Sequence, residues 1–368
     1  MHRLFTFLIL MTALYGGPGW IAKPAAASET PAPAAASDEP HIALLLPLGS
    51  HSFGTAAEAV KHGVMAAASI QAPPLPLRVY STSHQTDKIL AAYQQALQAG
   101  AQVVIGPLTR DAVTALAKSS LVQVPTLALN LPDNDNSLPR NLYLFGLSAE
   151  AEARQIARVA FDEGLKTATI ISSGTPLAKR TQAAFLDQWQ ELGGKTVLQA
   201  NVPPDQERLA ALHEDILKHP ADMIFLATDA QSARLARPYL DVTVPTYATS
   251  RIHDGDDPTH NNVDLNGIHF VEMPWLLIPD HPAVMIYPRP EPGHGVELDR
   301  LYGLGIDAFR LALILVKNPL LQNGVLLDGV TGQISLSDQR FSRDLTEAQF
   351  RQGQATPEEA PAMAESQP

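Results

Sequence analysis

Patterns typical of buried strands alternate with patterns typical of amphipathic helices along most of this chain. The first strand pattern is the continuous apolar run HIALLLPL at 41–48, and the following helix pattern places Ala57, Val60, Val64 and Ala67 at helical spacing. A continuous apolar run indicates a strand covered on both faces. Strands that alternate with helices form mostly parallel sheets, because parallel neighbours need crossover connections. The pattern therefore predicts an α/β fold.

The alternation comes in two successive blocks, which predicts two lobes, each a mostly parallel sheet flanked by helices. Strands are expected at 41–48, 77–82, 101–107 and 124–130 in the first block, and at 167–173, 196–201, 222–228 and 244–249 in the second; the segments 141–148 and 267–274 follow the two blocks. A Pro-rich loop at 279–293 precedes a helix at 297–318, and the Gly-rich segment GVLLDGVTGQISLS at 324–337 predicts a hairpin. Trp275 and Phe309 lie in apolar surroundings, which favours a packing role for both.

The two ends of the chain differ in composition from the region between them. Residues 1–27 have the pattern of a secretory signal peptide: a charged start with Arg3, an apolar run at 4–17 that is too short to span a bilayer, and small residues that allow cleavage near Ala27. An uncleaved anchor is the alternative. Residues 28–40 and 353–368 are rich in Pro and Ala without apolar periodicity, which predicts a linker and a disordered tail.

Charge and cysteine content argue against several classes of function. The chain has 26 Lys and Arg against 38 Asp and Glu, and cleavage would remove Arg3 and Lys23 but no acid, taking the net charge from −12 to −14. Such a surface repels nucleic acid and anionic lipid. The absence of cysteine excludes disulfides, thiolate metal sites, cysteine nucleophiles and a lipidated cysteine. We therefore expect a periplasmic protein that is not a lipoprotein, has no nucleic-acid partner and has no membrane span after cleavage.

Ligands of open α/β sheets bind at the carboxyl ends of the strands, so the strand-to-helix turns hold the candidate binding residues. Asp229 is the acid at such a turn that would match an ammonium group. The alternative for each residue is a helix cap or a turn, because Ser, Thr and Asp are preferred there. The candidates are Ser50, Thr109, Asn130, Ser148, Thr228, Asp229 and Ser250.

Sequence motifs for catalysis or cofactor binding do not appear. The turn in VVIGPLTRD at 103–111 lacks the lysine of a phosphate-binding loop, and its Asp111 would compete with an anion, so we interpret it as a structural turn with Thr109 capping a helix. No Gly-x-Ser-x-Gly elbow or dinucleotide fingerprint follows a strand. The segment HDGDDPTH at 253–260 has metal-ligand residues but neither calcium-loop nor zinc-helix spacing, so we read it as a polar loop, with metal binding as the alternative.

A set of ordered segments resembles one known family, the LppC/LpoA outer-membrane lipoproteins that activate bifunctional penicillin-binding proteins. The resemblance covers about residues 41–353 and the C-terminal domain of those proteins, and the GVTGQISLS hairpin also resembles the wider group of type I periplasmic binding proteins. The segments are VVIGPLTRDAVTALA, VPTLALN, LFGLSAEAEARQIARVA, WQELGGKTVL, YATSRI, LNGIHFVEMPWLL, RLYGLGIDAFRLAL, GVTGQISLS and AQFRQGQ.

The resemblance implies two lobes joined by crossing strands around a cleft. It assigns 41–146 plus 274–320 to the first lobe and 147–273 plus 321–352 to the second. Activators of the family carry a lipidated cysteine and an N-terminal helical-repeat domain, whereas this chain has no cysteine and a short Pro/Ala-rich linker.

Two functions from different classes follow. The first, implied by the resemblance, is a non-catalytic periplasmic protein that binds a bifunctional penicillin-binding protein and regulates peptidoglycan synthesis. The second is a solute-binding protein that holds a small polar ligand such as an amino acid in the cleft between the lobes. An enzyme is a third reading that no set of residues with defined roles supports, and no cofactor, metal or catalytic residue is expected.

Overall fold

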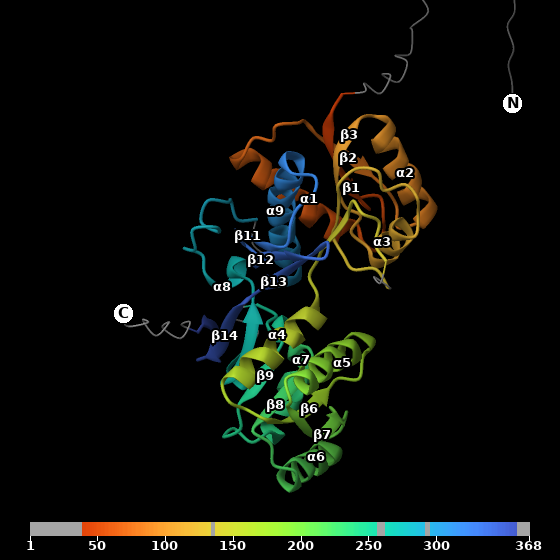
Figure 1. Ribbon diagram of the computed structural model, residues 1–368. Helices are drawn as coiled ribbons and strands as arrows, with labels where there is room; N and C mark the ends of the chain where they lie inside the picture. The colour runs from red at the N-terminus through yellow and green to blue at the C-terminus, as the bar shows by residue number, and fades with distance from the viewer. Residues whose placement is uncertain (1–38, 134–136, 256–261, 291–294, 359–368) are drawn as a thin grey trace, which may run out of the picture. The chain divides into compact units, whose positions relative to one another are not determined.

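A computed structural model describes residues 39–133, 137–255, 262–290 and 295–358, which are built around two β-sheets (Figure 1). The first sheet has 8 strands in the order β11-β12-β13-β5-β4-β3-β1-β2, and the second has 7 in the order β15-β14-β10-β9-β8-β6-β7. The strands of the first sheet are β1 His41–Leu46, β2 Leu77–Ser81, β3 Ala101–Ile105, β4 Thr126–Ala128, β5 Leu142–Phe145, β11 Gly324–Gly329, β12 Gly332–Ser337 and β13 Arg340–Asp344. Those of the second are β6 Thr167–Ser172, β7 Lys195–Asn201, β8 Met223–Ala227, β9 Thr246–Ala248, β10 Ile268–Glu272, β14 Thr346–Arg351 and β15 Gln354–Pro357.

Helices connect the strands. The helices are α1 Gly54–Ile70, α2 Thr86–Gln98, α3 Arg110–Ala117, α4 Ala149–Asp162, α5 Pro176–Glu191, α6 Gln206–Lys218, α7 Ala230–Ala236, α8 Pro274–Leu277 and α9 Val296–Lys317, with short 3₁₀ turns η1 Arg237–Tyr239, η2 Ser250–Ile252 and η3 Asn262–Leu265. Among the described residues, no helix combines the length and the apolar character needed to cross a membrane.

Both sheets are mixed and mostly parallel, which confirms the predicted α/β class. Strands β1 to β5 pair in parallel with one another, and β6, β7, β8, β9 and β10 do so in the second sheet. Strands β11 and β12 form the antiparallel hairpin that the Gly-rich segment predicts. We call the first sheet with its helices the first lobe and the second sheet with its helices the second lobe.

The chain passes between the two sheets three times. It leaves the first sheet after β5 for α4, returns after β10 through α8 and α9, and leaves again where β13 runs into β14 (Figure 1). Residues next to these crossings are thus held near the junction of the lobes whichever lobe they belong to.

Two predicted boundaries are wrong. We assigned 321–352 to the second lobe, but β13 pairs with β5 through Arg340 opposite Leu144 and Phe341 opposite Phe145, which places 324–344 in the first sheet. We also expected a disordered tail from 353, but β15 pairs with β14. The segment supplies a strand despite its polar composition because β14 offers an open edge of unpaired backbone groups. The predicted signal peptide 1–27, most of the predicted linker and residues 359–368 lie outside the described residues.

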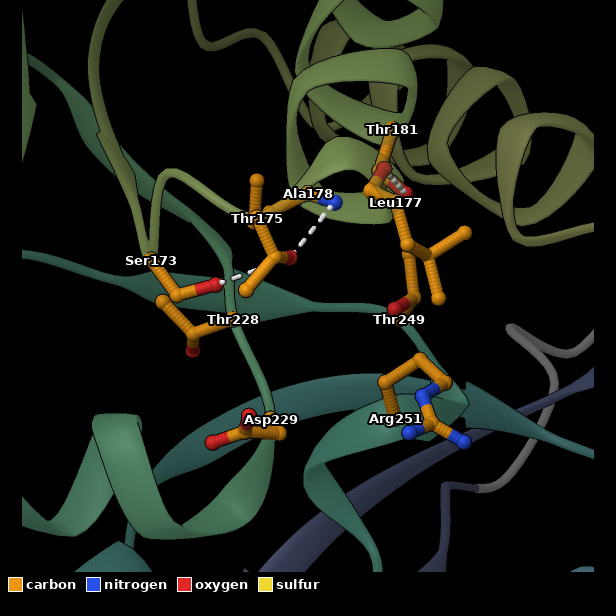
Figure 2. Close-up of a pocket in the computed structure, with 10 residues that line it drawn as sticks. Ser173, Thr175, Leu177, Ala178, Thr181, Thr228, Asp229, Thr249 and Arg251 are labelled. Carbon is orange, nitrogen blue, oxygen red and sulfur yellow. Dashed lines mark hydrogen bonds between the residues drawn. The ribbon is translucent and has the colours of Figure 1, made fainter.

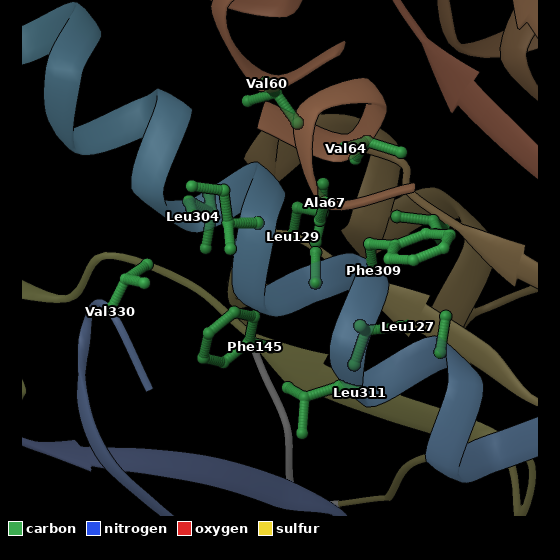
Figure 3. Close-up of a cluster of buried hydrophobic side chains, with 14 of the residues drawn as sticks. Val60, Val64, Ala67, Leu127, Leu129, Phe145, Leu304, Phe309, Leu311 and Val330 are labelled. Atoms are coloured by element: carbon green, nitrogen blue, oxygen red, sulfur yellow. The ribbon is translucent and has the colours of Figure 1, made fainter. Parts of the chain in front are cut away.

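The core of the first lobe forms between α1, α9 and the sheet. Figure 3 shows Val60 and Val64 of α1 near Phe309 and Leu304 of α9, above Phe145 of the sheet. All five side chains are buried, and each contributes about 1.5–3 kcal/mol by leaving water. Trp275 is also fully buried, so both aromatic residues expected to pack do so.

The second lobe has a core on each face of its sheet. On one face the ring of Phe185 from α5 stacks on Phe225 of β8, with ring centroids 4.1 Å apart, and Trp189 stacks on Phe185 in turn. On the other face Phe270 of β10 stacks on Phe350 of β14. A sheet buried on both faces holds its strand ends in fixed positions, and the candidate site is built on those ends.

Candidate functional site

A small pocket lined by hydroxyl groups lies at the carboxyl ends of β6, β8 and β9, beside the start of α5 (Figure 2). Its volume is about 50 Å³. The wall contains the hydroxyls of Ser173, Thr175, Thr181, Thr228 and Thr249, the carboxylate of Asp229 and the guanidinium of Arg251. The position agrees with the general rule that α/β sheets bind ligands beyond the carboxyl ends of their strands.

The side chains of this pocket differ in how fully they are hydrogen-bonded. Thr175 caps α5 by accepting from the backbone N–H of Ala178 at 3.2 Å, and Asp229 caps α7 by accepting from Ser232 at 2.8 Å. The Thr228 hydroxyl is buried and has no hydrogen-bond partner among the described residues. Figure 2 shows Thr228 and Asp229 on one side of the pocket and Arg251 on the other. A buried hydroxyl without a partner is costly, so it marks a place for a ligand group or a water.

A second cavity of about 270 Å³ adjoins the pocket, because Leu177 and Arg251 line both. Its wall is rich in charge and comes from both lobes. The charged residues are Arg110 of α3, Glu150 and Glu152 of α4, Arg180 of α5, Arg251 of η2, and Glu297 and Arg300 of α9. Asn130 and Ser250 also line it. The two lobes thus meet around a polar space.

A buried ion pair ties α9 to the second lobe behind this cavity. The Arg300 guanidinium pairs with Glu272 at the end of β10 and donates to the carbonyls of Ser250 at 2.9 Å and His253 at 2.8 Å. Glu272 also contacts the His253 ring, with Nδ1 3.0 Å from Oε2. Burial alone would raise the pKa of Glu272, but Arg300 and His253 outweigh burial and lower it to about 2. The carboxylate therefore stays ionised although it is buried.

Helix α4 makes a second set of buried contacts at the junction. Glu152 accepts from the backbone N–H of Ser250 at 3.0 Å and from its hydroxyl at 2.8 Å, and it lies 3.7 Å from Arg343. Burial raises the pKa of Glu152 against the opposing effect of Arg343. Gln155 binds the crossing between β13 and β14 through two hydrogen bonds: its side chain donates to the Leu345 carbonyl at 2.8 Å and accepts from the Leu345 N–H at 3.0 Å. These contacts fix the crossing strands in one geometry.

The lowered pKa of Glu272 predicts acid-dependent stability. Its folded value of about 2 lies below the ordinary 4.5, so its contribution is complete above pH 4.5 and is lost as the pH falls from 4.5 towards 2. The contribution is on the order of 3 kcal/mol. Glu152 has a raised pKa and acts in the opposite direction. Urea unfolding at a series of pH values should show a smaller loss of stability below pH 4.5 for Glu272→Gln than for the unsubstituted chain, and equal losses would contradict the assignment.

The structure brings together four of the seven candidate binding residues, in two groups. Thr228 and Asp229 line the hydroxyl pocket, and Asn130 and Ser250 line the adjoining cavity. The side-chain amide of Asn130 donates to the Leu108 carbonyl at 3.0 Å and accepts from the Leu131 N–H at 2.9 Å. Ligand binding by these four residues stays a prediction.

The other three candidates lie outside the walls of both cavities. The Ser50 hydroxyl accepts from Phe53 at 3.2 Å within its turn, and Ser148 caps α4 by accepting from Ala151 at 3.1 Å. Thr109 occupies the cap position of α3, but its side chain makes no capping bond, so the predicted cap is wrong in that detail. At the same turn Gly106 has φ +111°, and a Cβ there would lie 2.1 Å from the Leu45 carbonyl oxygen. This turn is built for close packing.

The polar segment at 253–260 is described only as far as residue 255. His253 is buried against Glu272, and Asp254 forms a bidentate ion pair with Arg234, with hydrogen bonds of 2.8 and 2.9 Å. These two side chains point to separate protein partners. Within the described ranges, no group of three or more potential ligands gathers that could hold a metal ion.

Sequence reasoning missed the arginines of the cavity. Arg110, Arg180 and Arg300 lie within helices whose apolar periodicity alone was interpreted. The signal was present for Arg300, which follows Glu297 at three residues and lies, with Asp307, among the mostly apolar residues on the buried side of α9. A charge on the buried face of a helix indicates a buried partner.

Comparisons with known proteins agree with this architecture. The family model named "LppC putative lipoprotein" matches residues 35–353. The penicillin-binding protein activator LpoA of Pantoea ananatis is 30% identical over 327 residues, 76% of this chain and 47% of that protein. The chain therefore spans about half the length of the curated relatives it matches.

Solved structures show the same fold. A "putative branched-chain amino acid ABC transporter" from Chromobacterium violaceum is 36% identical, with a TM-score of 0.72 over 84% of this chain and 99% of that one. The LpoA C-domain from Haemophilus influenzae, named as a regulator of PBP1A, is 24% identical with a TM-score of 0.73, over 86% of this chain and 99% of that one. The two sheets, the three crossings and the family match over 35–353 agree, and the chain belongs to the LppC family.

Proposed function

We propose that this chain is a periplasmic regulator that binds a bifunctional penicillin-binding protein and raises its activity. The observation that carries the proposal is the family match over 35–353, together with the relatives named penicillin-binding protein activator LpoA. The match spans both lobes, so the chain contains the complete two-lobed unit that aligns with the LpoA C-domain. Activation of this kind requires that the chain bind the active state of the synthase more tightly than the inactive state.

A regulatory role rather than a catalytic one is consistent with how the buried charges are used. Glu272 and Arg300 neutralise each other, and Glu152 is bonded to Ser250. The Glu272–Arg300 pair joins the two lobes, and Glu152 accepts two hydrogen bonds from Ser250, so both carboxylates are engaged in structural contacts. We further propose export through the signal peptide at 1–27 and a mature chain without a lipid anchor, since the sequence has no cysteine to carry one.

In-cell crosslinking tests the proposed partner. A photo-crosslinkable residue is placed at exposed positions such as Met285, Val242 and Leu217, which are spread along the chain, and the crosslinked products are identified by mass spectrometry. We expect a bifunctional penicillin-binding protein to be captured from at least one position and to be lost when the partner gene is deleted. Capture of only transporter membrane components, or of no protein reproducibly, would contradict the proposal.

A second candidate function, solute binding, is favoured by the unpartnered Thr228 hydroxyl in a pocket at the strand ends. The similarity to the structure named as a branched-chain amino acid ABC transporter supports the same reading. The same protein can have both functions. A ligand bound at the junction of the lobes would favour one arrangement of the crossing strands over another, and the synthase could respond to that arrangement.

A further inference from the structure

Strand β2 forms one edge of the first sheet, because among the described strands only β1 pairs with it. At the end of β2 the Thr82 N–H donates to the Leu46 carbonyl of β1 at 2.9 Å. The backbone groups of a strand alternate between its two sides, so every second residue before Thr82 faces β1 as well. The residues between them point their N–H and C=O groups away from the sheet. These residues are Leu77, Val79 and Ser81.

The outward backbone groups of β2 have no partner in the part of the chain that the structure describes. No hydrogen bond from another described residue reaches the backbone of Leu77, Val79 or Ser81. The Val79 side chain is 45% exposed as well. Prolines at 73–76 precede the strand, and they protect only its beginning. The edge is therefore open to pairing with another extended segment.

A groove of about 540 Å³ lies between the end of β2 and helix α2. Ser81 lines it on the side of the strand, and Ala91 and Ala92 line it on the side of the helix, where their small side chains leave space. Lys88 is the one charged residue among the described residues of its wall, and it forms no ion pair with a described residue. The groove thus combines room for side chains with a single positive charge.

We propose that the β2 edge and this groove bind an extended acidic segment of the synthase, which adds a strand to the first sheet; this inference rests on the function proposed above. The main chain of the segment pairs with the outward groups of β2, which is the source of affinity when a peptide extends a sheet. Its side chains on the α2 side enter the groove. A carboxylate among them reaches Lys88.

The chemistry of the edge decides between possible occupants. Only another strand can pair with alternate N–H and C=O groups along the length of a strand, so the occupant is an extended polypeptide. The positive charge of the groove favours a segment that carries an acid. A second copy of this chain fits less well, because its own β2 carries Arg78 and no acid.

A proline at position 79 tests the pairing of the edge directly. Val79→Pro removes an outward N–H that no described residue uses and leaves the bonds to β1 in place, a position where edge strands tolerate proline. Gln199→Pro on β7, an edge of the second sheet, is the matched control. The Val202 N–H donates to the Ser172 carbonyl at 2.8 Å, so residue 199 also faces outward. That variant loses an exposed side-chain bond to Gln182 and should bind the synthase normally.

Two variants of α2 test the groove. Ala91→Trp fills it from an exposed position, so the core is not disturbed, and it carries the test if Val79→Pro does not fold. Gln94→Trp is its matched control, because Gln94 is exposed on the same helix but does not line the groove. Lys88→Glu reverses the charge of the wall and should repel an acidic segment.

Binding of the full chain to an immobilised bifunctional penicillin-binding protein from the same organism is the measurement, with folding checked by circular dichroism. We expect Val79→Pro, Ala91→Trp and Lys88→Glu each to raise Kd at least tenfold, equal to about 1.4 kcal/mol, and the two controls to stay within about twofold. Unchanged binding by folded Val79→Pro or by Ala91→Trp overturns this site and leaves the proposed function standing. An equal loss in Gln199→Pro also overturns it.

The remaining outcomes separate the site from the proposed function and from self-association. No binding by the unsubstituted chain overturns the proposed function and this inference together. Sedimentation of the chain alone covers the second copy. A dimer that Val79→Pro abolishes, with synthase binding unchanged, would assign the β2 edge to self-association and overturn the inference.

Discussion

Glu272→Gln is expected to lower the free energy of unfolding by about 3–5 kcal/mol, the loss usual when one partner of a buried ion pair is removed. Glu272 is fully buried at the end of β10, and its partner Arg300 has 5% of its side chain exposed. Without the carboxylate, Arg300 keeps its bonds to the carbonyls of Ser250 and His253 but loses its buried counter-charge. Urea unfolding followed by circular dichroism measures the change.

A control and a double variant separate this pair from general effects of charge. Glu214→Gln on α6 removes an exposed acid, 72% accessible, that lies 3.7 Å from Lys218, and it should change stability by less than about 1 kcal/mol. The double variant Glu272→Gln with Arg300→Met should lose less than the sum of its two single variants by at least about 1 kcal/mol. Additive losses would show that the two side chains do not stabilise each other.

Gly305→Ala is expected to lower stability by about 2–3 kcal/mol although alanine favours helices. Helix α9 crosses α1 at two glycines, where a Cβ on Gly305 would lie 2.2 Å from the Val60 carbonyl oxygen and a Cβ on Gly63 would lie 2.0 Å from that of Tyr302. Both obstacles are backbone atoms of a neighbouring helix, so the two helices must move apart to admit a methyl group. The separation would open the core between α1, α9 and the sheet, which thermal or urea unfolding detects.

Gly303→Ala is the matched control in the same helix. A Cβ there would lie 3.3 Å from the Met273 sulfur, the end of a flexible side chain that can give way. Its stability should therefore change by less than about 1 kcal/mol in either direction. If Gly303→Ala and Gly305→Ala had equal effects, the close approach of the helix backbones would not be what requires glycine at 305.

The class of fold followed from local patterns, but the order of the strands did not. Continuous apolar runs such as 41–48 and the Gly-rich hairpin at 324–337 correspond to β1 and to β11 with β12. The pairing of β13 with β5 joins residues almost two hundred positions apart, and the side chain of Gln339 supports it by donating to the carbonyls of Pro139 and Leu142. No local periodicity reports such a contact. The division of 321–352, which the family resemblance implied, could not be checked against any local pattern and was wrong.

The binding residues were predicted by position and not by chemistry. Knowing that ligands gather at strand ends was enough to select Thr228 and Asp229, which share a pocket. It also selected Ser148, whose hydroxyl is used as a helix cap. The arginines were missed because Arg110, Arg180 and Arg300 come from three helices that only the tertiary fold brings around one cavity.

Activation of a synthase by this two-lobed chain, as we propose it, can be followed as a change in the rates of the synthase. The purified chain is titrated into a bifunctional penicillin-binding protein from the same organism, and glycan polymerisation and peptide crosslinking are followed with time. We expect a saturable rise in at least one of the two rates, and no rise with the chain unfolded by heat beforehand. Unchanged rates at concentrations that saturate crosslinking between the two proteins would contradict activation, provided that circular dichroism shows the chain to be folded.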